Sequence, residues 1–474
     1  EMYKFIREIL ECIDENNYQL KTIEKKDPTP LAKQIWQDIW SVSGATPENC
    51  LYTFVEIFIF KYLSDLNVIK GIYNFNSIIE MYKTNNENEV LENYAKVVRP
   101  KIKDLFPKNL KDNTTIINGT IFVSKDDKAV EGYSGVFKKI LFRFKEYGKL
   151  ENIDYEFKSK LFESFLKESI SKKNWGQFFT PLKIVQPMVK MSEIREGMSI
   201  CDPACGVGKF LLEAVLPKMK DLYKIKDGKL EGKVTLHGFD KGFDKEEQRT
   251  IILAKANMLI YFSDLIRENP EITDQFSKLF NDTFILKTNS ILGTLRDPVE
   301  NQYDLILTNP PYVTSGSSNL KEEIKKDESL ENYYKVNGLG VEGLFMEWII
   351  RALKPGGKAF IVIPDGILNR QNDTNLRKFM IESCYIDALI SLPINSFFTT
   401  NKKTYIIALT KKHNINDTQT DPVFSYIVSD IGETLDIYRF ETGNNELEEA
   451  VNLFNQFKGA KTRFYSYDDR CKIF

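Results

Sequence analysis

The chain has 474 residues, of which 42% are hydrophobic and 28% are charged, and its formal net charge at pH 7 is −2. That length and composition are typical of a globular protein with two domains. The sequence has no uncharged apolar run of about 18 residues, so we expect no membrane-spanning helix. It also lacks the basic surplus of a protein that grips nucleic acid alone, because phosphate contacts need lysine and arginine.

The first 165 residues are predicted to form an N-terminal helical domain. Apolar residues recur at helical spacing over residues 31–40, and a long apolar helix is expected from residue 47 through residue 66. The aromatic residues of these helices are expected to fill a core rather than to line a ligand site.

Beyond residue 165 the pattern changes to short β-rich runs that alternate with helical segments. Strands are expected at Met198–Asp202, Val234–Asp240, Tyr303–Thr308, Lys358–Pro364, Ile386–Leu392 and Tyr405–Leu409. Helices are expected at Leu211–Lys220, Glu246–Leu259, Leu344–Leu353 and Asn375–Glu382. This alternation predicts a doubly wound, Rossmann-like α/β domain over residues 166–440. The remaining residues, 441–474, are predicted to be a C-terminal helical tail with one amphipathic helix at residues 444–458.

A glycine-containing loop follows the first predicted strand, which ends at Asp202. Gly206 and Gly208 let the backbone turn sharply and approach a ligand closely, and an apolar helix begins near Phe210. Doubly wound sheets bind ligands beyond the carboxyl ends of their strands, where this loop is expected. A plain turn between a strand and a helix is the alternative interpretation.

An acidic residue, Asp240, ends the second predicted strand. A carboxylate at this position can accept hydrogen bonds from both ribose hydroxyls of a nucleoside cofactor. The interval from Gly208 to Asp240 exceeds the roughly 20 residues of a dinucleotide-binding fold, and the polar stretch at residues 221–233 is expected to be an insertion that accounts for it. His237, inside the same strand, is expected to be a structural residue with a satisfied hydrogen bond.

The most specific motif is the strand at residues 303–308 followed by Asn309-Pro310-Pro311-Tyr312. Two consecutive prolines fix φ and remove two hydrogen-bond donors, so the side-chain oxygen of Asn309 and the carbonyl of Pro310 can point at one place. Two acceptors aimed at one amine suit an aromatic amino group, and Tyr312 offers a flat surface on which a base can stack. A strand-ending turn with an exposed tyrosine is the alternative interpretation.

Thr180 and Pro181 have the pattern of a helix N-cap followed by proline at the first helical position. The free N–H groups of a helix N-terminus can receive a carboxylate, such as that of a methionine moiety. An ordinary well-capped helix explains the same pattern.

Six cysteines and two histidines are scattered along the chain, without a Cys-x-x-Cys pair. This pattern predicts no metal site and leaves little scope for histidine-based acid–base chemistry. The thiols are expected to be reduced, and because no cleavable signal pattern stands near the start, the chain is expected to be cytoplasmic. The first residue is Glu1 rather than methionine, so a segment can be missing upstream.

In their order along the chain, these segments resemble the N6-adenine DNA methyltransferases, and most closely the modification subunit of type I restriction–modification systems. The resemblance is carried by Gly176–Pro181, Asp202–Leu211, Gly238–Lys241 and Asn309–Tyr312, with support from Leu353–Lys358, Ile363–Gly366 and Leu392–Asn401. It extends over about residues 30–450. It implies a class I SAM-dependent methyltransferase fold, with S-adenosylmethionine as cofactor and the N6 amine of adenine in double-stranded DNA as methyl acceptor.

The resemblance also assigns roles to particular residues. It implies that the cofactor contacts Gln177, Phe178, Phe179, Thr180, Pro181 and Leu182 at its methionine end, Asp202, Ala204, Cys205, Gly206 and Gly208 at the glycine loop, and Asp240 at its ribose. It implies that a flipped adenine is held by Asn309, Pro310, Pro311 and Tyr312, and stacked by Tyr312 and by either Phe397 or Phe398. Relatives often carry an aspartate near the cofactor's adenine where this chain has Asn289, whose amide can still hydrogen bond to that ring.

For partners, the resemblance implies DNA, a separate specificity subunit and a second copy of the modification subunit, and it leaves a restriction subunit open. A separate specificity subunit agrees with the missing basic surplus and with the lack of an obvious target-recognition region. Three alternatives stay open: a methyltransferase that acts on an RNA or on a protein amide, the methyltransferase portion of a fused restriction–modification enzyme, and a non-catalytic assembly subunit.

Overall fold

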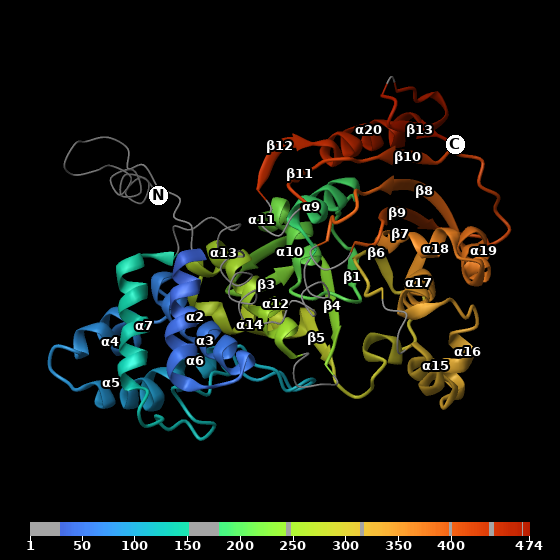
Figure 1. The fold of residues 1–474 in the computed structure, drawn as a ribbon. Coiled ribbons are helices and arrows are strands. Elements are labelled where there is room, and N and C mark those ends of the chain that lie inside the picture. Colours follow the sequence, from blue (N-terminus) through green and yellow to red (C-terminus); the bar gives the residue numbers. More distant parts are fainter. Residues whose placement is uncertain are drawn as a thin grey trace, which may run out of the picture.

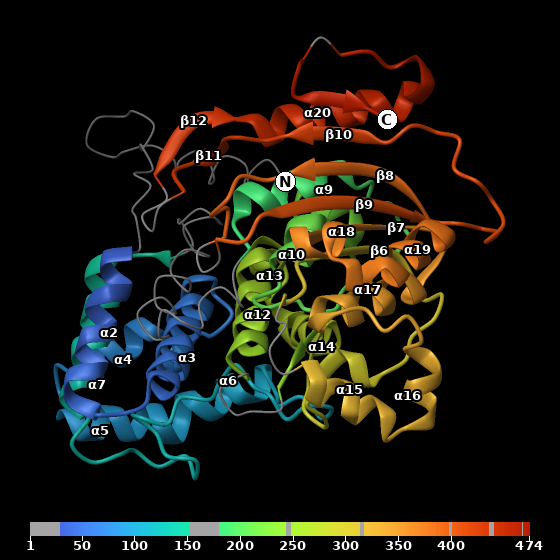
Figure 2. The same ribbon diagram turned by 45° about the vertical axis from the view of Figure 1, so that its right-hand side comes forward.

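The computed structural model describes residues 29–150, 180–242, 248–312, 317–397, 401–435, 440–466 and 468–474. A group of N-terminal helices lies beside one edge of a long sheet, and the C-terminal segments lie along the other edge (Figures 1 and 2). None of the described helices has both the length and the hydropathy of a membrane-crossing segment.

The described part of the N-terminal region is mostly helical, apart from the non-helical segment at residues 106–133. Its helices are α2 (Thr29–Ser43), α3 (Pro47–Asp65), α4 (Phe75–Met81), α5 (Glu87–Asn93), α6 (Arg99–Leu105) and α7 (Ser134–Tyr147). Helix α3 begins after Thr46, whose side chain accepts a hydrogen bond from the N–H of Asn49. Residues 50–64 of α3 are buried on every side, so this helix forms the centre of the N-terminal helices.

A nine-stranded, mostly parallel sheet organises the rest of the chain. Its strands are β1 (Ser199–Asp202), β4 (Thr235–Lys241), β5 (Phe284–Lys287), β6 (Tyr303–Thr308), β7 (Leu353–Pro364), β8 (Cys384–Ser391), β9 (Thr404–Lys411), β10 (Phe424–Ile427) and β13 (Cys471–Ile473). They lie in the order β13-β10-β8-β9-β7-β6-β1-β4-β5, with β9 and β13 antiparallel to their neighbours. The predicted doubly wound α/β fold is therefore confirmed.

The connection order reverses at β1, which pairs in parallel with both β4 and β6. The chain runs from β1 outward to β4 and β5, and then returns across β1 to β6 and β7. This reversal leaves the carboxyl ends of β1, β4 and β6 side by side at one edge of the sheet. In open α/β sheets such a point is where ligands bind.

Helices cover both faces of the sheet. One face packs against α9 (Leu182–Met191), α10 (Lys209–Val215), α12 (Gln248–Tyr261), α13 (Ser263–Glu268) and α14 (Thr273–Thr283). The other face packs against α15 (Ser317–Lys325), α16 (Glu328–Tyr333), α17 (Gly340–Ala352), α18 (Asp365–Asn369) and α19 (Thr374–Ser383). Two hydrophobic cores result, the first on the α9–α14 face of the sheet and the second on the α15–α19 face. Side chains of β6 alternate between them, because Leu305 and Leu307 enter the first core and Ile306 enters the second.

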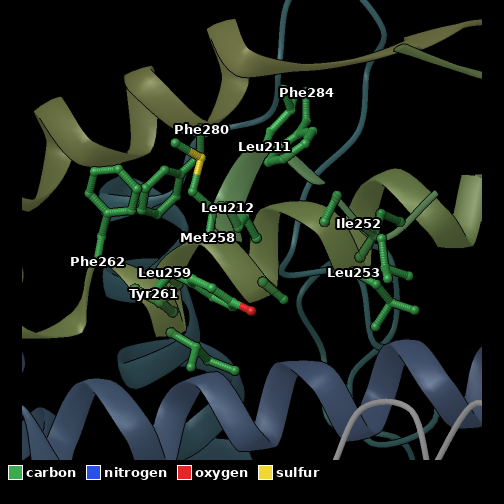
Figure 3. Close-up of a cluster of buried hydrophobic side chains, with 14 of the residues drawn as sticks. Leu211, Leu212, Ile252, Leu253, Met258, Leu259, Tyr261, Phe262, Phe280 and Phe284 are labelled. Carbon is green, nitrogen blue, oxygen red and sulfur yellow. The ribbon is translucent and has the colours of Figure 1, made fainter. Parts of the chain in front are cut away.

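The first core is continuous with the core of the N-terminal helices. Figure 3 shows part of it, where Leu211 of α10 lies beside Phe284 of β5 and where Met258 of α12 lies near the rings of Phe262 and Phe280. The centroids of those two rings are 5.9 Å apart in an edge-on arrangement. Phe284 is the first residue of β5 and lies level with Gly238 of β4 and Asp202 at the end of β1.

The segment after the glycine loop differs from the prediction. A single helix was expected to continue to Lys220, but α10 ends at Val215 and is followed by a short helix at residues 216–218. Pro217 has no N–H with which to continue an α-helix, which explains the break. The polar stretch at residues 221–233, expected as an insertion, forms the hairpin of β2 (Tyr223–Lys226) and β3 (Lys229–Gly232).

The C-terminal residues contain more than the expected helix. Helix α20 (Glu446–Ala460) is present, and β13 beyond it pairs antiparallel with β10 as an edge strand of the main sheet. Strands β11 (Ile431–Glu433) and β12 (Glu441–Asn445) form a separate ladder across the predicted boundary at residue 440. The other predicted boundary, at residue 165, lies outside the described residues, and the domain limits stay predictions.

A buried polar cluster joins the N-terminal region to the sheet. The ammonium group of Lys255, on α12, donates to Oγ1 of Thr114 at 2.6 Å and to Oδ1 of Asn281 at 2.9 Å. Asp112 lies 3.9 Å from that ammonium group and accepts a hydrogen bond from the N–H of Leu286 in β5. Burial lowers the pKa of Lys255 to about 8, and the nearby charge of Asp112 opposes this shift.

This lowered pKa predicts a specific pH dependence of stability. Between about pH 8 and 10.5 the unfolded chain holds the Lys255 proton and the folded chain does not, so the free energy of unfolding rises with pH. Relative to Lys255→Met, the wild-type value should rise by up to roughly 3 kcal/mol over this range. Urea denaturation at pH 7.5 and pH 10 measures the difference.

The matched control is Lys278→Met, which removes an exposed lysine from the neighbouring helix α14. Its pH profile should run parallel to that of the wild type. A difference between wild type and Lys255→Met that does not change with pH would contradict the buried, weakly basic state of this lysine.

Candidate active site

The candidate site lies where the carboxyl ends of β1, β4 and β6 meet. Asp202 is the last residue of β1, Asp240 lies near the end of β4, and Asn309 directly follows β6. The parallel register sets Asp202 beside Gly238 and sets Cys201 beside Ile306. Three motifs that are separate in the sequence therefore stand on adjacent strands.

Two residues of the glycine loop have backbone conformations that residues with a side chain rarely adopt. Gly206 has φ +51° and Gly208 has φ +82°, which is the left-handed region. A Cβ atom on Gly208 would lie 2.5 Å from Cζ of Phe284, closer than any real contact. Helix α10 begins directly afterwards at Lys209. The loop thus turns sharply and packs closely on the core at the same point.

Two carboxylates hold this loop. Asp240 accepts hydrogen bonds from the N–H of Gly206 at 3.1 Å and of Lys241 at 2.8 Å. Asp202 is buried and accepts from Oγ1 of Thr308 at 2.7 Å and from the N–H of Ala204 at 3.2 Å. Burial raises the pKa of Asp202 to about 7, with a further contribution from the charge of Asp240. Asp202 therefore links β1 to β6 beneath the loop.

Asn309 presents a hydrogen-bond acceptor that is not used within the described chain. Its Nδ2 donates to Oγ1 of Thr180 at 3.1 Å. Its Oδ1 is buried and has no hydrogen-bond partner among the described residues. A buried acceptor without a partner is costly, so this oxygen marks a point at which a ligand with an N–H or O–H group would be stabilised.

Tyr312 follows the two prolines and is held from two sides. Its ring lies edge-on to Phe397, with centroids 6.4 Å apart. The ammonium group of Lys402 donates to the carbonyl oxygen of Tyr312 at 3.1 Å and lies 5.9 Å from the ring centroid. Burial raises the pKa of the Tyr312 phenol, so the ring stays neutral. Phe397 is almost completely buried, and Phe398 lies outside the described residues.

The expected N-cap role of Thr180 is wrong. Helix α9 begins at Leu182, Pro181 is its N-cap, and no side chain caps it. The carbonyl of Pro181 instead accepts from the N–H groups of Ile184 and Val185. The Thr180 hydroxyl is turned to Asn309. Gln177, Phe178 and Phe179, which were predicted to border the same site, lie outside the described residues.

Three other residues from the sequence analysis, Asn289, Cys205 and His237, lie in or near strands of the sheet. Asn289 follows β5 and is exposed, and its Oδ1 accepts from Oγ1 of Thr288 at 3.3 Å. Cys205 is buried, and its N–H donates to the carbonyl of Phe239 in β4. His237 meets the hydroxyl of Tyr303 at 3.1 Å, in agreement with a structural role.

Sequence analysis missed three residues that support the site. Thr308 bonds to Asp202, Lys402 bonds to Tyr312, and Thr294 donates to the carbonyl of Pro203 at 2.7 Å. Thr308 stands directly before Asn309, and this position at a strand end was the available signal. The other two come from distant segments and give no local signal.

Two cavities of about 460 and 500 Å³ lie elsewhere in the described structure. Neither is lined by Asp240, Asn309 or Tyr312. Among the described residues no cluster of histidine, cysteine, aspartate or glutamate is arranged to hold a metal ion. The site is therefore defined by the strand-end residues and their hydrogen bonds.

Comparison with known proteins agrees with this arrangement of fold and motifs. The family model for N-6 DNA methylase matches residues 154–469, about two thirds of the chain. The chain belongs to the N-6 DNA methylase family.

Among curated proteins, the chain is similar to the methylase subunit of the type I restriction enzyme EcoEI from Escherichia coli. The two are 28% identical over 319 residues, which is 65% of this chain and 58% of that protein. The chain is also 25% identical over 300 residues to the type II methyltransferase M.HincII of Haemophilus influenzae, covering 62% of this chain and 49% of that protein. It thus spans about half the length of these curated relatives.

Solved structures share the fold over nearly the whole chain. A Vibrio vulnificus YJ016 protein, described as a type I restriction enzyme modification subunit, gives a TM-score of 0.61 at 17% identity and covers 95% of this chain and 92% of its own. A type I restriction–modification methyltransferase subunit from Streptococcus thermophilus gives 0.56 at 17% identity, with 93% and 95% covered. These likenesses establish the fold.

The close approach of Gly208 to the core predicts a large effect of Gly208→Ala. The alanine requires both a left-handed backbone and displacement of the Phe284 ring. We expect it to lower the free energy of unfolding by about 1–2 kcal/mol for the backbone and by a further 1–3 kcal/mol, roughly, for the steric clash. Urea denaturation measures the loss.

Gly228→Ala is the matched control, because Gly228 has φ +69° and no atom within 4 Å of its Cβ position. It should show the backbone cost alone. Equal losses for the two variants would contradict a packing role for Gly208.

Proposed function

We propose that this chain transfers a methyl group from S-adenosylmethionine to the N6 amine of adenine in DNA. The observation that carries the proposal is the buried Oδ1 of Asn309, without a partner among the described residues, beside a loop held by Asp240. Membership of the N-6 DNA methylase family supports it.

The chemistry of the acceptor explains the choice of residue. The lone pair of an aromatic amine is conjugated with its ring and is a poor nucleophile. If Asn309 Oδ1 and the Pro310 carbonyl each accept one of the amine hydrogens, they hold the nitrogen in a geometry that frees the lone pair. Asn309 is neutral, so it orients the amine without acting as a base, and the acceleration comes from placement. The proton that the methylated nitrogen must lose would pass to water.

The residues around the loop fit the proposed cofactor. S-adenosylmethionine supplies a methyl group made electrophilic by a sulfonium centre. Asp240 would also accept from ribose hydroxyls, because the two oxygens of a carboxylate together offer about four acceptor sites. The segment from Thr180 to Leu182 would border the methionine end, and Asn289 would meet the adenine end.

Tyr312 is the proposed stacking surface for a base that has left the duplex. Its ring is held edge-on by Phe397, and its carbonyl is held by Lys402. Because Phe397 is buried against Tyr312, we assign it to supporting that ring. Another side chain would then stack on the second face of the base, and Phe398 is the proposed one.

We further propose that the chain acts as the modification subunit of a type I restriction–modification complex. The similarity in fold to such subunits over more than nine tenths of the chain supports this. The net charge of −2 also favours a partner that contributes to DNA binding, because phosphate contacts need a surplus of lysine and arginine. The proposed partners are a specificity subunit, a second copy of this chain and a restriction subunit.

A methyl-transfer assay with tritium-labelled cofactor tests the acceptor. The chain should be assayed with the products of its neighbouring genes, on unmethylated DNA, on RNA and on protein. We expect label in DNA alone, recovered as N6-methyladenine after digestion. Label in RNA or protein, or no transfer with all partners present, would overturn the proposal.

Asn309→Ala tests the role of the acceptor. By analogy with the removal of a preorganised hydrogen-bonding group, kcat should fall on the order of a hundredfold or more. Cofactor affinity, measured by calorimetric titration, should stay within about twofold, because orientation of the amine is needed only for transfer.

Asn416→Ala, which truncates an exposed asparagine, is the control and should change neither quantity. Equal losses of transfer and of cofactor binding in Asn309→Ala would count against the assigned role.

A further inference from the structure

We propose that Thr180 is a positioning residue that holds the side-chain amide of Asn309 with its oxygen facing the substrate. This inference rests on the proposed function and adds a residue to it. The contact that carries it is the hydrogen bond from Asn309 Nδ2 to Thr180 Oγ1, at 3.1 Å. The resemblance to known methyltransferases placed Thr180 against the cofactor, whereas here its hydroxyl meets the catalytic asparagine.

An asparagine side chain needs such a partner because its two ends are nearly alike in shape and opposite in hydrogen bonding. The oxygen accepts and the NH₂ group donates. A rotation by half a turn would aim a donor at the amine of the substrate, where two sets of N–H groups would repel. Thr180 takes the NH₂ end, and the Oδ1 end stays buried without a partner among the described residues.

Thr180 is itself fixed by the helix that follows it. Pro181 restricts the backbone, and its carbonyl accepts from the N–H groups of Ile184 and Val185, whose side chains are completely buried. Farther along α9, Gln186 donates to Glu213 of α10 at 3.2 Å. The hydroxyl is therefore presented to Asn309 from an element anchored in the core.

The contact between Thr180 and Asn309 allows two roles of Thr180 to be distinguished, one on the cofactor and one on Asn309. Thr180 and Asn309 are 129 residues apart in the chain, and the contact joins the start of α9 to the end of β6. If Thr180 acted mainly on the cofactor, removing its hydroxyl would weaken cofactor binding. If it acts through Asn309, the same change lowers transfer and leaves cofactor binding unchanged.

The first test is Thr180→Val, which keeps the side-chain shape and removes the hydroxyl. We expect kcat to fall about 10- to 100-fold, the range that corresponds to one buried donor left without a partner. Cofactor affinity by calorimetric titration should stay at the wild-type value. The midpoint of thermal unfolding should fall slightly, because Nδ2 of Asn309 loses its partner, and the variant should stay folded at the assay temperature. Thr180→Ser keeps the hydroxyl and should restore most of kcat.

The second test is a double-mutant cycle with Asn309→Asp. A carboxylate has an oxygen at both ends, so no rotation of it presents a donor to the substrate. In this background Thr180→Val should lower kcat only a few fold. A loss as large as in the wild-type background would show that Thr180 acts independently of Asn309.

Three other results would overturn the inference. They are a loss of cofactor affinity in Thr180→Val that matches its loss of kcat, an unchanged kcat in Thr180→Val, and a Thr180→Ser variant as impaired as Thr180→Val. A wild-type chain that is inactive with all partners and substrates would instead contradict the proposed function itself, so the two failures are distinguishable.

Discussion

The candidate site depends on the parallel pairing of β1 with β4 on one side and with β6 on the other. Because the connections leave β1 in both directions, the ends of the three strands meet. The polar groups at those ends are tied across the strands, since Asp240 of β4 holds the loop that follows β1 and Asp202 of β1 holds Thr308 of β6. The loop and Asn309 therefore belong to one hydrogen-bonded unit, and a shift in any strand would disturb all of it.

The glycine loop is set by the core as well as by hydrogen bonds. The ring of Phe284 lies where a Cβ atom of Gly208 would be, and also where a Cβ atom of Gly238 would be, at 2.6 Å from its Cδ1. The loop can therefore be both a tight turn between a strand and a helix and a ligand-binding loop. Glycine is needed for tight packing between a strand and a helix, and the turn that results lies over the strand ends, where the N–H groups of Ala204, Cys205 and Gly206 bond to β1 and β4.

The central fold could be predicted because its strands are long enough to show apolar runs, as at residues 303–308 and 358–364. Strand β5 has four residues and β13 has three, too few to show a period. Strand β1 is equally short, but the glycine loop that follows it indicated where it ends. The site residues at strand ends were predictable from motif types. The hydrogen bond between Thr180 and Asn309 was not, because it joins segments 129 residues apart, and the local pattern of Thr180 favoured a cap that the helix does not use.

The buried side-chain oxygen of Asn309 affects the free energy of substrate binding. Oδ1 of Asn309 is buried and has no partner among the described residues, a state that costs on the order of 1–3 kcal/mol. A substrate that donates a hydrogen bond there would recover this cost on binding. An amide oxygen carries a partial negative charge and is only very weakly basic, so it attracts N–H and O–H groups without taking up their protons. Asp202, although its pKa is raised to about 7, already accepts bonds from Thr308 and Ala204 beneath the loop. The arrangement therefore favours orientation of a neutral amine over transfer of a proton by a side chain, which matches the chemistry that an exocyclic aromatic amine requires.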